Sequence, residues 1–363
     1  NGNLLGYQIF DSGYSVGNCI KQTTDGGYIV AGYNVLEDYP CMRLTKYDVN
    51  GYLEWDQCYS DGNPGAEYGE YVQQHSDGGF VIIGDFLVKT NAVGVVEWTN
   101  EDFSAGVEIQ ETTDGGYVSL NNMSIVNAEQ TESFSSPTIT KLDSQGEMVW
   151  SQIYGDEEQN EFGISIKQTS DDGYVCLISV ISGYDILKVG ADGGVEWSQN
   201  YSNEAFLGSF NLQGTITNSE MNYINSTSDD GYVVSGQYSY NYFGTNYSGV
   251  FITKLNTNGV EIWSQNYLDD SLLGDKHINM VKETVDEGYI ICGSKPFLEI
   301  DETVPFLIKT DNSGDIISTI EFPKIKKFPI TTIDILGRET TNNKGFQLHI
   351  YDDGSVEKKY LIK

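Results

Sequence analysis

Thr24-Asp-Gly-Gly-Tyr-Ile-Val-Ala-Gly32 and, after a loop, Lys46-Tyr-Asp-Val-Asn-Gly-Tyr-Leu-Glu-Trp55 form the first copy of a pattern that recurs along the 363-residue chain. The turn motif begins at Asp25, Asp77, Asp114, Asp171, Asp229 and Asp286. In each copy a Lys stands five positions before a Gly, at Lys46, Lys89, Lys141, Lys188, Lys254 and Lys309. Four positions after that Gly stand Trp55, Trp98, Trp150, Trp197 and Trp263, and in the sixth copy Ser318. Repetition of this kind indicates one structural unit copied six times.

Each copy predicts four short strands, here lettered A to D in chain order. In the first copy Gly17–Thr24 and Tyr28–Asn34 flank the Asp25-Gly-Gly turn, and Met42–Asp48 and Tyr52–Tyr59 flank Asn50-Gly51. Asp-Gly and Asn-Gly turns between β-rich runs are strong hairpin signals. Four-stranded units spaced by 37 to 58 residues fit propeller blades better than solenoid rungs. The sequence therefore predicts an all-β fold, a β-propeller of six four-stranded blades.

The predicted propeller covers residues 1–322, and a small C-terminal β module covers 323–363. Within the propeller, 1–10 is a terminal strand and the blades are about 11–59, 60–102, 103–154, 155–201, 202–267 and 268–322. Copy six already has a D strand at Asp315–Phe322, so Leu4–Phe10 is a spare D strand. A seven-bladed propeller with one blade truncated at the N-terminus is the alternative. The first residues lack signal-peptide features, which fits a leader already removed or a chain that begins inside a repeat.

Charge and hydropathy narrow the function classes. The net charge of −33 disfavours nucleic acid as a partner, because the phosphates would be repelled. Residues 323–363 differ in composition, with eight basic and five acidic side chains. No apolar run approaches the ~18 residues of a membrane-spanning helix. We expect a monomeric protein with no membrane-spanning segment.

The repeated residues have structural and functional interpretations. The Asp and Asn residues of the turns are expected to cap their own backbone. Calcium is the alternative, although the turns lack the ligand count of a calcium loop. The six Lys residues are expected to pair with nearby turn carboxylates, with an anion-binding ring as the alternative. The Trp residues are expected to pack between blades. We predict no cofactor, with Ca²⁺ kept as the alternative.

The sequence predicts no catalytic residue. The three His residues, His75, His277 and His349, have no metal-ligand spacing, and no common hydrolase motif is found. Paired carboxylates for glycosidase chemistry stay open, because 53 acidic residues offer many pairs.

Binding is expected on the face that carries the B–C and D–A loops, because these loops vary among the copies. The predicted B–C loops are 35–40, 121–137, 237–249 and 294–305. One of them is rich in aromatic residues, and its candidate ligand-binding residues are Tyr238, Tyr240, Tyr242, Phe243 and Tyr247. Such rings beside Asn and Ser suit a sugar or a protein partner. A simple extension of the strands, with alternate Tyr residues, is the other interpretation.

The chain has five Cys residues, and Cys41 and Cys58 flank the first C–D hairpin. With a two-residue turn they would be direct cross-strand neighbours at disulfide distance. A bulge at Gly51 would shift the register and separate them.

The C-terminal segment resembles the sorting signal of substrates of the type IX secretion system of Bacteroidetes. The resemblance lies in Asp334-Ile-Leu-Gly-Arg-Glu339, in Ile350-Tyr-Asp-Asp-Gly354 and in Glu357-Lys-Lys359 before an apolar strand. The blades also resemble repeats of secreted proteins of that phylum. The resemblance implies export across the outer membrane, followed by surface attachment or release. It implies no defined activity.

Three functions follow as alternatives. The leading one is a secreted or cell-surface binding or adhesion protein, which contacts a glycan or a protein through the B–C/D–A face. The second is a polysaccharide-acting lyase or hydrolase with carboxylates in its central funnel. The third is a structural spacer without a ligand.

Overall fold

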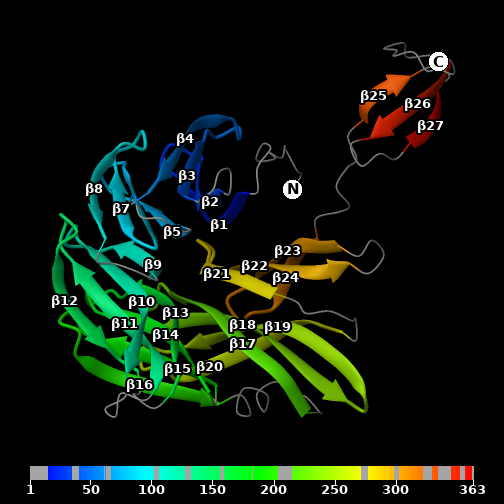
Figure 1. Ribbon diagram of the computed structural model, residues 1–363. Helices are drawn as coiled ribbons and strands as arrows, with labels where there is room; N and C mark the ends of the chain where they lie inside the picture. The colour runs from blue at the N-terminus through cyan, green and yellow to red at the C-terminus, as the bar shows by residue number, and fades with distance from the viewer. Residues whose placement is uncertain are drawn as a thin grey trace.

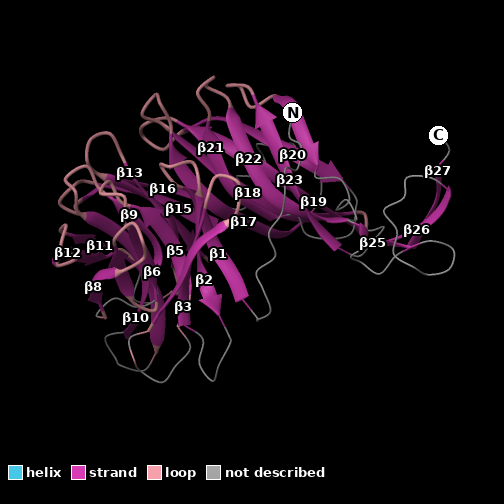
Figure 2. Ribbon diagram, turned by 90° about the horizontal axis from the view of Figure 1, so that it is seen from above, coloured by secondary structure: helices cyan, strands magenta, loops and turns pink. Residues whose placement is uncertain are grey.

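The computed structural model describes residues 15–34, 41–60, 62, 67–101, 106–126, 132–155, 159–181, 183–202, 215–270, 277–297, 302–321, 329–333, 345–351 and 356–361. Every regular element within these ranges is a β-strand (Figure 2). The predicted terminal strand at 1–10 and the linker around Pro323 lie outside the described residues.

Six four-stranded antiparallel sheets are arranged in a ring, which confirms the six-bladed β-propeller (Figure 1). In each sheet the strands follow chain order, and the first strand of every blade is the innermost. Blade 1 contains β1 (Ser15–Gln22), β2 (Tyr28–Asn34), β3 (Cys41–Tyr47) and β4 (Leu53–Tyr59). Blade 2 contains β5 (Gly69–Gln74), β6 (Phe80–Gly84), β7 (Leu87–Thr90) and β8 (Val96–Asn100). Blade 3 contains β9 (Gly106–Glu111), β10 (Tyr117–Val126), β11 (Ser133–Leu142) and β12 (Met148–Ile153).

The second half of the ring repeats this order. Blade 4 contains β13 (Phe162–Gln168), β14 (Tyr174–Val180), β15 (Gly183–Val189) and β16 (Val195–Ser202). Blade 5 contains β17 (Thr215–Ser226), β18 (Tyr232–Tyr242), β19 (Thr245–Leu255) and β20 (Glu261–Asp270). Blade 6 contains β21 (His277–Glu283), β22 (Tyr289–Phe297), β23 (Glu302–Thr310) and β24 (Ile316–Glu321).

The contacts within the A–B turn account for the Asp and the third-position Gly of its sequence motif. The Asp25 carboxylate accepts a hydrogen bond from the backbone N–H of Gly27 at 2.9 Å. A Cβ atom on Gly27 would lie 2.3 Å from the carbonyl oxygen of Tyr47, so only Gly fits this third position. The equivalent glycines of the other blades meet the same obstacle.

Each repeat Lys joins the A–B turn to the C strand of the same blade. The Lys side chain extends to the repeat Asp, with N–O distances between 2.7 and 3.1 Å in all six blades. In blade 1 the Lys46 ammonium also donates to Glu54 and to the carbonyl of Tyr47. Five of these Lys side chains are at most 8 % exposed, whereas Lys309 of blade 6 is 23 % exposed. The six ammonium groups are therefore already engaged by carboxylates of their own blades.

Apolar side chains fill the space between successive blades. Blade 1 packs on blade 2 through Ile29, Met42 and Leu44, which meet Val72 and Phe80. Each Trp adds an aromatic contact with the next blade, and the pairs are Trp55–Phe80, Trp98–Tyr117, Trp150–Tyr174, Trp197–Tyr232 and Trp263–Tyr289. This burial of apolar area is the main stabilising force of the ring.

The B–C connections differ from the predicted loops. In blade 5 the predicted loop 237–249 is a continuation of β18 and β19, which stay paired up to Tyr242 and Thr245. In blade 3, β10 and β11 stay paired up to Val126 and Ser133. Blade 6 shows the same extension, to Phe297 and Glu302. The prediction of loops was wrong in blades 3 and 6 because cross-strand pairing continues beyond the blade body, and in blade 5 the alternative interpretation, an extension of the strands, is confirmed. The segment 35–40 lies outside the described residues.

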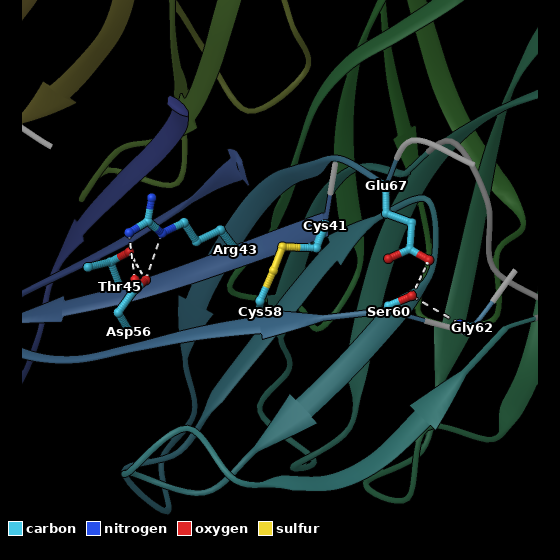
Figure 3. The surroundings of a disulfide bond; sticks show 8 residues. All are labelled: Cys41, Arg43, Thr45, Asp56, Cys58, Ser60, Gly62 and Glu67. Atoms are coloured by element: carbon cyan, nitrogen blue, oxygen red, sulfur yellow. Dashed lines mark hydrogen bonds and ion pairs between the residues drawn. A yellow bond between two sulfur atoms is a disulfide. The ribbon is translucent and has the colours of Figure 1, made fainter. Parts of the chain in front are cut away.

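The structure joins Cys41 and Cys58 by a disulfide, with 5.8 Å between the Cα atoms (Figure 3). The predicted direct pairing does not occur, because a bulge between Lys46 and Tyr47 shifts the register and places Cys58 opposite Arg43. The bond therefore runs diagonally across the two strands. Arg43 forms an ion pair with Asp56 beside it (Figure 3).

After the propeller a separate three-stranded sheet follows, which contains β25 (Pro329–Ile333), β26 (Gly345–Tyr351) and β27 (Val356–Leu361). Figure 1 shows this sheet outside the ring. The segments Asp334–Glu339 and Asp352–Gly354 of the sorting motif lie outside the described residues.

The central channel as a candidate binding site

The six innermost strands share an irregularity that shapes the channel at the centre of the ring. Each of them has a β-bulge that leaves one residue unpaired, seven positions before the repeat Asp. These residues are Asn18, Glu70, Val107, Ile164, Asn222 and Asn279. A bulge redirects the side chains around it. Five of the six bulged residues line a cavity of about 650 Å³ at the channel.

The channel lining is the part of the inner strands in which the copies differ most. Six positions before the repeat Asp, the blades carry Cys19, Tyr71, Glu108, Ser165, Tyr223 and Met280 in turn. The Asp, Lys and Gly positions of the turns, in contrast, are nearly constant. A near-symmetric scaffold therefore surrounds an asymmetric lining.

One residue of this lining, Glu108, belongs to a buried ion pair between blades 3 and 4. The carboxylate of Glu108 on β9 contacts the ammonium of Lys167 on β13, and both residues are at most 5 % exposed. The second carboxylate oxygen accepts hydrogen bonds from the Ser165 hydroxyl and the Ile166 backbone N–H, both at 2.8 Å. The Lys167 ammonium also donates to the carbonyl of Ile166 and lies 4.4 Å from the ring centre of Tyr223.

These contacts fix the charge state of Glu108. Burial alone would raise its pKa, but the Lys167 charge and the hydrogen bonds from Lys167, Ile166 and Ser165 outweigh it, so the pKa of Glu108 lies below its usual range. Glu108 is an ionised carboxylate with both oxygens occupied. It is therefore unsuited to the role of a proton donor.

The open side of the cavity carries groups that a ligand can reach. Asn18 lies in the first half of β1, Glu70 stands at the start of β5, and Ser294 lies in β22, all toward the B–C/D–A face. Burial, followed by the nearby charge of Asp85, raises the pKa of Glu70. The Lys21 ammonium lies 4.5 Å from the ring centre of Tyr71. The cavity thus combines an anion, a cation, amides and aromatic rings.

A second cavity of about 430 Å³ lies at the opposite face, between blades 4 and 5. Its lining includes Asp171, Lys188 and Trp197, which are repeat residues. Because Lys188 is paired with Asp171 and Glu196, this cavity follows from the repeat itself. The central channel is the stronger candidate.

The aromatic segment of blade 5 is largely internal. Tyr238 and Tyr240 are 2 % and 8 % exposed and belong to the cluster that packs blades 4 and 5. Tyr247 stacks on Tyr240 with 5.1 Å between the ring centres, and Tyr242 packs against the same cluster. Phe243 alone of the five is exposed, at 92 %, in the turn between β18 and β19. A binding role of this segment stays a prediction, and Phe243 is the side chain that presents it to solvent.

None of the channel residues was predicted from the sequence. Glu108 and Lys167 are 59 positions apart and carry no shared motif. The signal that could have found them is the variation among the copies at a fixed distance from the repeat Asp. At that distance only one copy has a carboxylate.

Metal binding at the turns is the other chemistry that the sequence left open. Within the described ranges, no three His, Cys, Asp or Glu side chains gather into a metal-binding group. The Asp48 carboxylate accepts hydrogen bonds from the backbone N–H groups of Asn50 and Tyr52, both at 2.8 Å. None of the described residues belongs to a helix long and apolar enough to cross a membrane.

Comparison with known proteins gives structural likeness only. No family model and no curated protein matches the chain. One similar structure is a protein of unknown function from Bacteroides caccae, with TM-score 0.49 and 11 % identity over 81 % of this chain and 93 % of that one. Another is Sqt1 from Chaetomium thermophilum, with TM-score 0.47 and 10 % identity over 97 % and 83 % of the two chains. An endo-arabinase from Bacteroides thetaiotaomicron has TM-score 0.41 and 10 % identity over 84 % and 97 %.

Proposed function

We propose that the protein is a secreted or cell-surface binding protein that recognises a glycan or a protein at the mouth of its central channel, on the B–C/D–A face. The observation that carries the proposal is the asymmetric, charged and aromatic lining of the channel within a repeated scaffold. Residues that serve only the fold can be the same in every blade. Residues that differ at one geometric position fit a ligand that itself lacks sixfold symmetry.

The chemistry of the lining supports recognition more than catalysis. Retaining and inverting glycosidases use two carboxyl groups, of which one donates a proton. Glu108 is ionised, buried and hydrogen-bonded at both oxygens, and so does not meet that requirement. Glu70 can accept hydrogen bonds from sugar hydroxyls or from a peptide, and Lys21 can donate them.

A binding screen tests the proposal. Polysaccharides and cell-surface proteins would be screened against the full chain and against a Lys21→Met/Glu70→Gln variant. The matched control is Phe243→Ser, which changes the exposed tip of blade 5 and leaves the channel intact. We expect the channel variant to lose at least about tenfold in affinity, as for one or two lost charged hydrogen bonds.

Other outcomes would move the function elsewhere. Loss of binding in Phe243→Ser alone would place the site on the β18–β19 hairpin. Reducing ends that appear in a polysaccharide sample would favour the enzyme alternative. A protein that binds nothing in either form would favour the spacer.

We further propose export by a type IX secretion system, with residues 323–363 as the signal. The support is the sequence resemblance of Asp334–Glu339, Ile350–Gly354 and Glu357–Lys359. The test is secretion of the chain with and without 323–363 in a Bacteroidetes host. We expect the truncated chain to stay inside the cell, and equal secretion of both chains would refute the signal.

A further inference from the structure

The junction between blade 6 and blade 1 differs from the other five junctions. On blade 1, Ile20 is 59 % exposed and Tyr28 is 37 % exposed. The equivalent residues of the other blades are at most 2 % exposed. The equivalents of Ile20 are Val72, Ile109, Ile166, Ile224 and Val281. The equivalents of Tyr28 are Phe80, Tyr117, Tyr174, Tyr232 and Tyr289. An apolar sheet face that every other blade covers is thus uncovered on blade 1.

Blade 6 presents the opposite side of the same junction. Ile290 is 37 % exposed, whereas its equivalents Ile29, Val81, Val118, Val175 and Val233 are fully buried. Leu307 and Cys292 are half-buried and line the cavity next to the junction. Two apolar faces therefore look toward the same space without filling it.

The junction also lacks the contact that fastens the others. At each of the other junctions, a Trp of the outer strand meets the aromatic residue of the next A–B turn. At the junction of blades 6 and 1, the residue at the Trp position of blade 6 would have to meet Tyr28 of blade 1. That residue is Ser318, which is exposed. Blade 6 cannot make this contact with blade 1.

The chain before β1 carries the sequence of the missing element. Counted from Gly2, the segment 2–10 has Gln8 where four outer strands have Gln57, Gln152, Gln199 and Gln265. Phe10 stands at the position of Tyr59, Tyr154, Tyr201 and Tyr267. These residues lie outside the described ranges, and the described chain resumes at Ser15 on blade 1.

Chain order decides where such a strand belongs. An outer strand packs on the blade that follows it, as the hydroxyl of Tyr59 donates to the carbonyl of Gly94 in blade 2 and that of Tyr267 donates to Gly314 in blade 6. The segment 2–10 precedes blade 1, whose face is the uncovered one. Seven positions separate Phe10 from Gly17, close to the nine between the equivalent residues Tyr154 and Gly163 at the junction of blades 3 and 4.

We propose that residues 2–10 form an outer strand that docks between blades 6 and 1 and packs on Tyr28. The strand places Gly6 at the Trp position of the repeat, opposite the Tyr28 ring. The junction is therefore sealed by the N-terminal segment and not by direct contact of the two blades.

The test introduces a Trp at each of the two positions that could pack on Tyr28, which are residue 6 of the N-terminal segment and residue 318 of blade 6. Gly6→Trp in the full chain is expected to raise the melting temperature by about 2 °C or more, since one aromatic pair is gained. Tyr28→Ala in the same chain should cancel that gain. The matched control, Ser318→Trp, should give no gain that depends on Tyr28. In the unmodified chain, amide hydrogens of residues 2–10 should exchange as slowly as those of β4.

Three results would overturn the proposal. Stabilisation by Ser318→Trp alone, cancelled by Tyr28→Ala, means that blade 6 closes directly on blade 1. Exchange of residues 2–10 at the rate of an unstructured chain means that the segment does not dock. Slow exchange without coupling between Gly6→Trp and Tyr28 means that the strand docks elsewhere.

Discussion

At the second position of each A–B turn the backbone is left-handed, and only three blades place Gly there. Gly26, Gly78 and Gly115 have φ between 78° and 87°, whereas Asp172, Asp230 and Glu287 hold φ between 62° and 64°. A left-handed conformation costs a residue with a Cβ about 1–2 kcal/mol, and Asp tolerates it better than Glu. The last three blades therefore carry a local strain that the first three avoid.

Glu287→Gly is expected to raise the free energy of unfolding by about 1 kcal/mol, because Gly adopts this conformation freely. Urea unfolding monitored by Trp fluorescence measures the change. The control is Gly26→Ala, which should lower the same quantity. A Glu287→Gly protein that is less stable than the parent would show that the Glu side chain contributes more than its backbone strain.

The Glu108–Lys167 pair predicts asymmetric effects of single and double substitutions. Glu108→Gln leaves the buried Lys167 without its counter-charge and is expected to cost about 3 kcal/mol of unfolding free energy. The double variant Glu108→Gln/Lys167→Met removes both charges and should recover most of that loss. A loss in the double variant equal to the sum of the two single losses would mean that the pair is not coupled. Urea unfolding of the two single variants and the double variant completes the cycle.

The repeat Asp residues predict acid sensitivity. Burial alone would raise the pKa of Asp114, but the hydrogen bonds from Thr112, Lys141 and the Gly116 backbone together outweigh it and lower the pKa to about 2. Asp229 behaves alike, with Lys254 and Thr227 as donors and a pKa of about 2. Because these pKa values lie below the usual ~3.9, the stabilisation is complete above about pH 4 and is lost as the pH falls toward 2.

The measurement is the difference in unfolding free energy between the parent protein and Asp114→Asn, since the net charge of −33 changes the stability of both with pH. We expect the difference to shrink from pH 4 to pH 2 and to be smaller in high salt, because the Asp side chains are exposed. A difference that does not vary with pH would show that Asp114 acts through its shape and not its charge.

At the scale of elements, the sequence predicted the strands where turn chemistry fixes them and failed where only pairing decides. A Gly at a fixed offset from the repeat Asp or the repeat Lys marks the A–B and C–D ends in every copy, so strand order and blade number followed. Residues 237–249 alternate Tyr with polar residues, which suits an aromatic loop as well as a hairpin extension. The pairing of β18 with β19 is settled by the partner strand and not by local sequence.

The candidate site could not be predicted from local sequence for a similar reason. Glu108 and Lys167 come from neighbouring blades, and only the ring brings their strands together. The diagonal path of the Cys41–Cys58 bond likewise depends on a bulge that the turn sequence permits but does not specify. Long-range contacts of this kind are set by packing of whole elements.

The Trp residues predict what one junction contributes. Trp98 on β8 packs on Tyr117 of blade 3, with 5.8 Å between the ring centres. Trp98→Ala is expected to lower the unfolding free energy by about 2 kcal/mol, less than for a fully buried Trp, because the side chain is half-buried. Ser318→Ala, at the equivalent but exposed position of blade 6, should change it by less than about 0.5 kcal/mol. If Trp98→Ala lowered the unfolding free energy as little as Ser318→Ala, the Trp contact would contribute nothing to the junction.

At the scale of the whole molecule, the ring and the C-terminal sheet are expected to unfold independently. Packing among the described strands connects blades 1 to 6 in succession and connects β25, β26 and β27 with one another. The apolar clusters that stabilise the described ring draw all their residues from blades 1 to 6. The chain 1–322 should therefore melt within about 2 °C of the full chain, as measured by the Trp fluorescence of the five outer strands. A fall of more than about 5 °C would mean that residues 323–363 cap the propeller as part of its fold. That result would count against their proposed role as a separate sorting module.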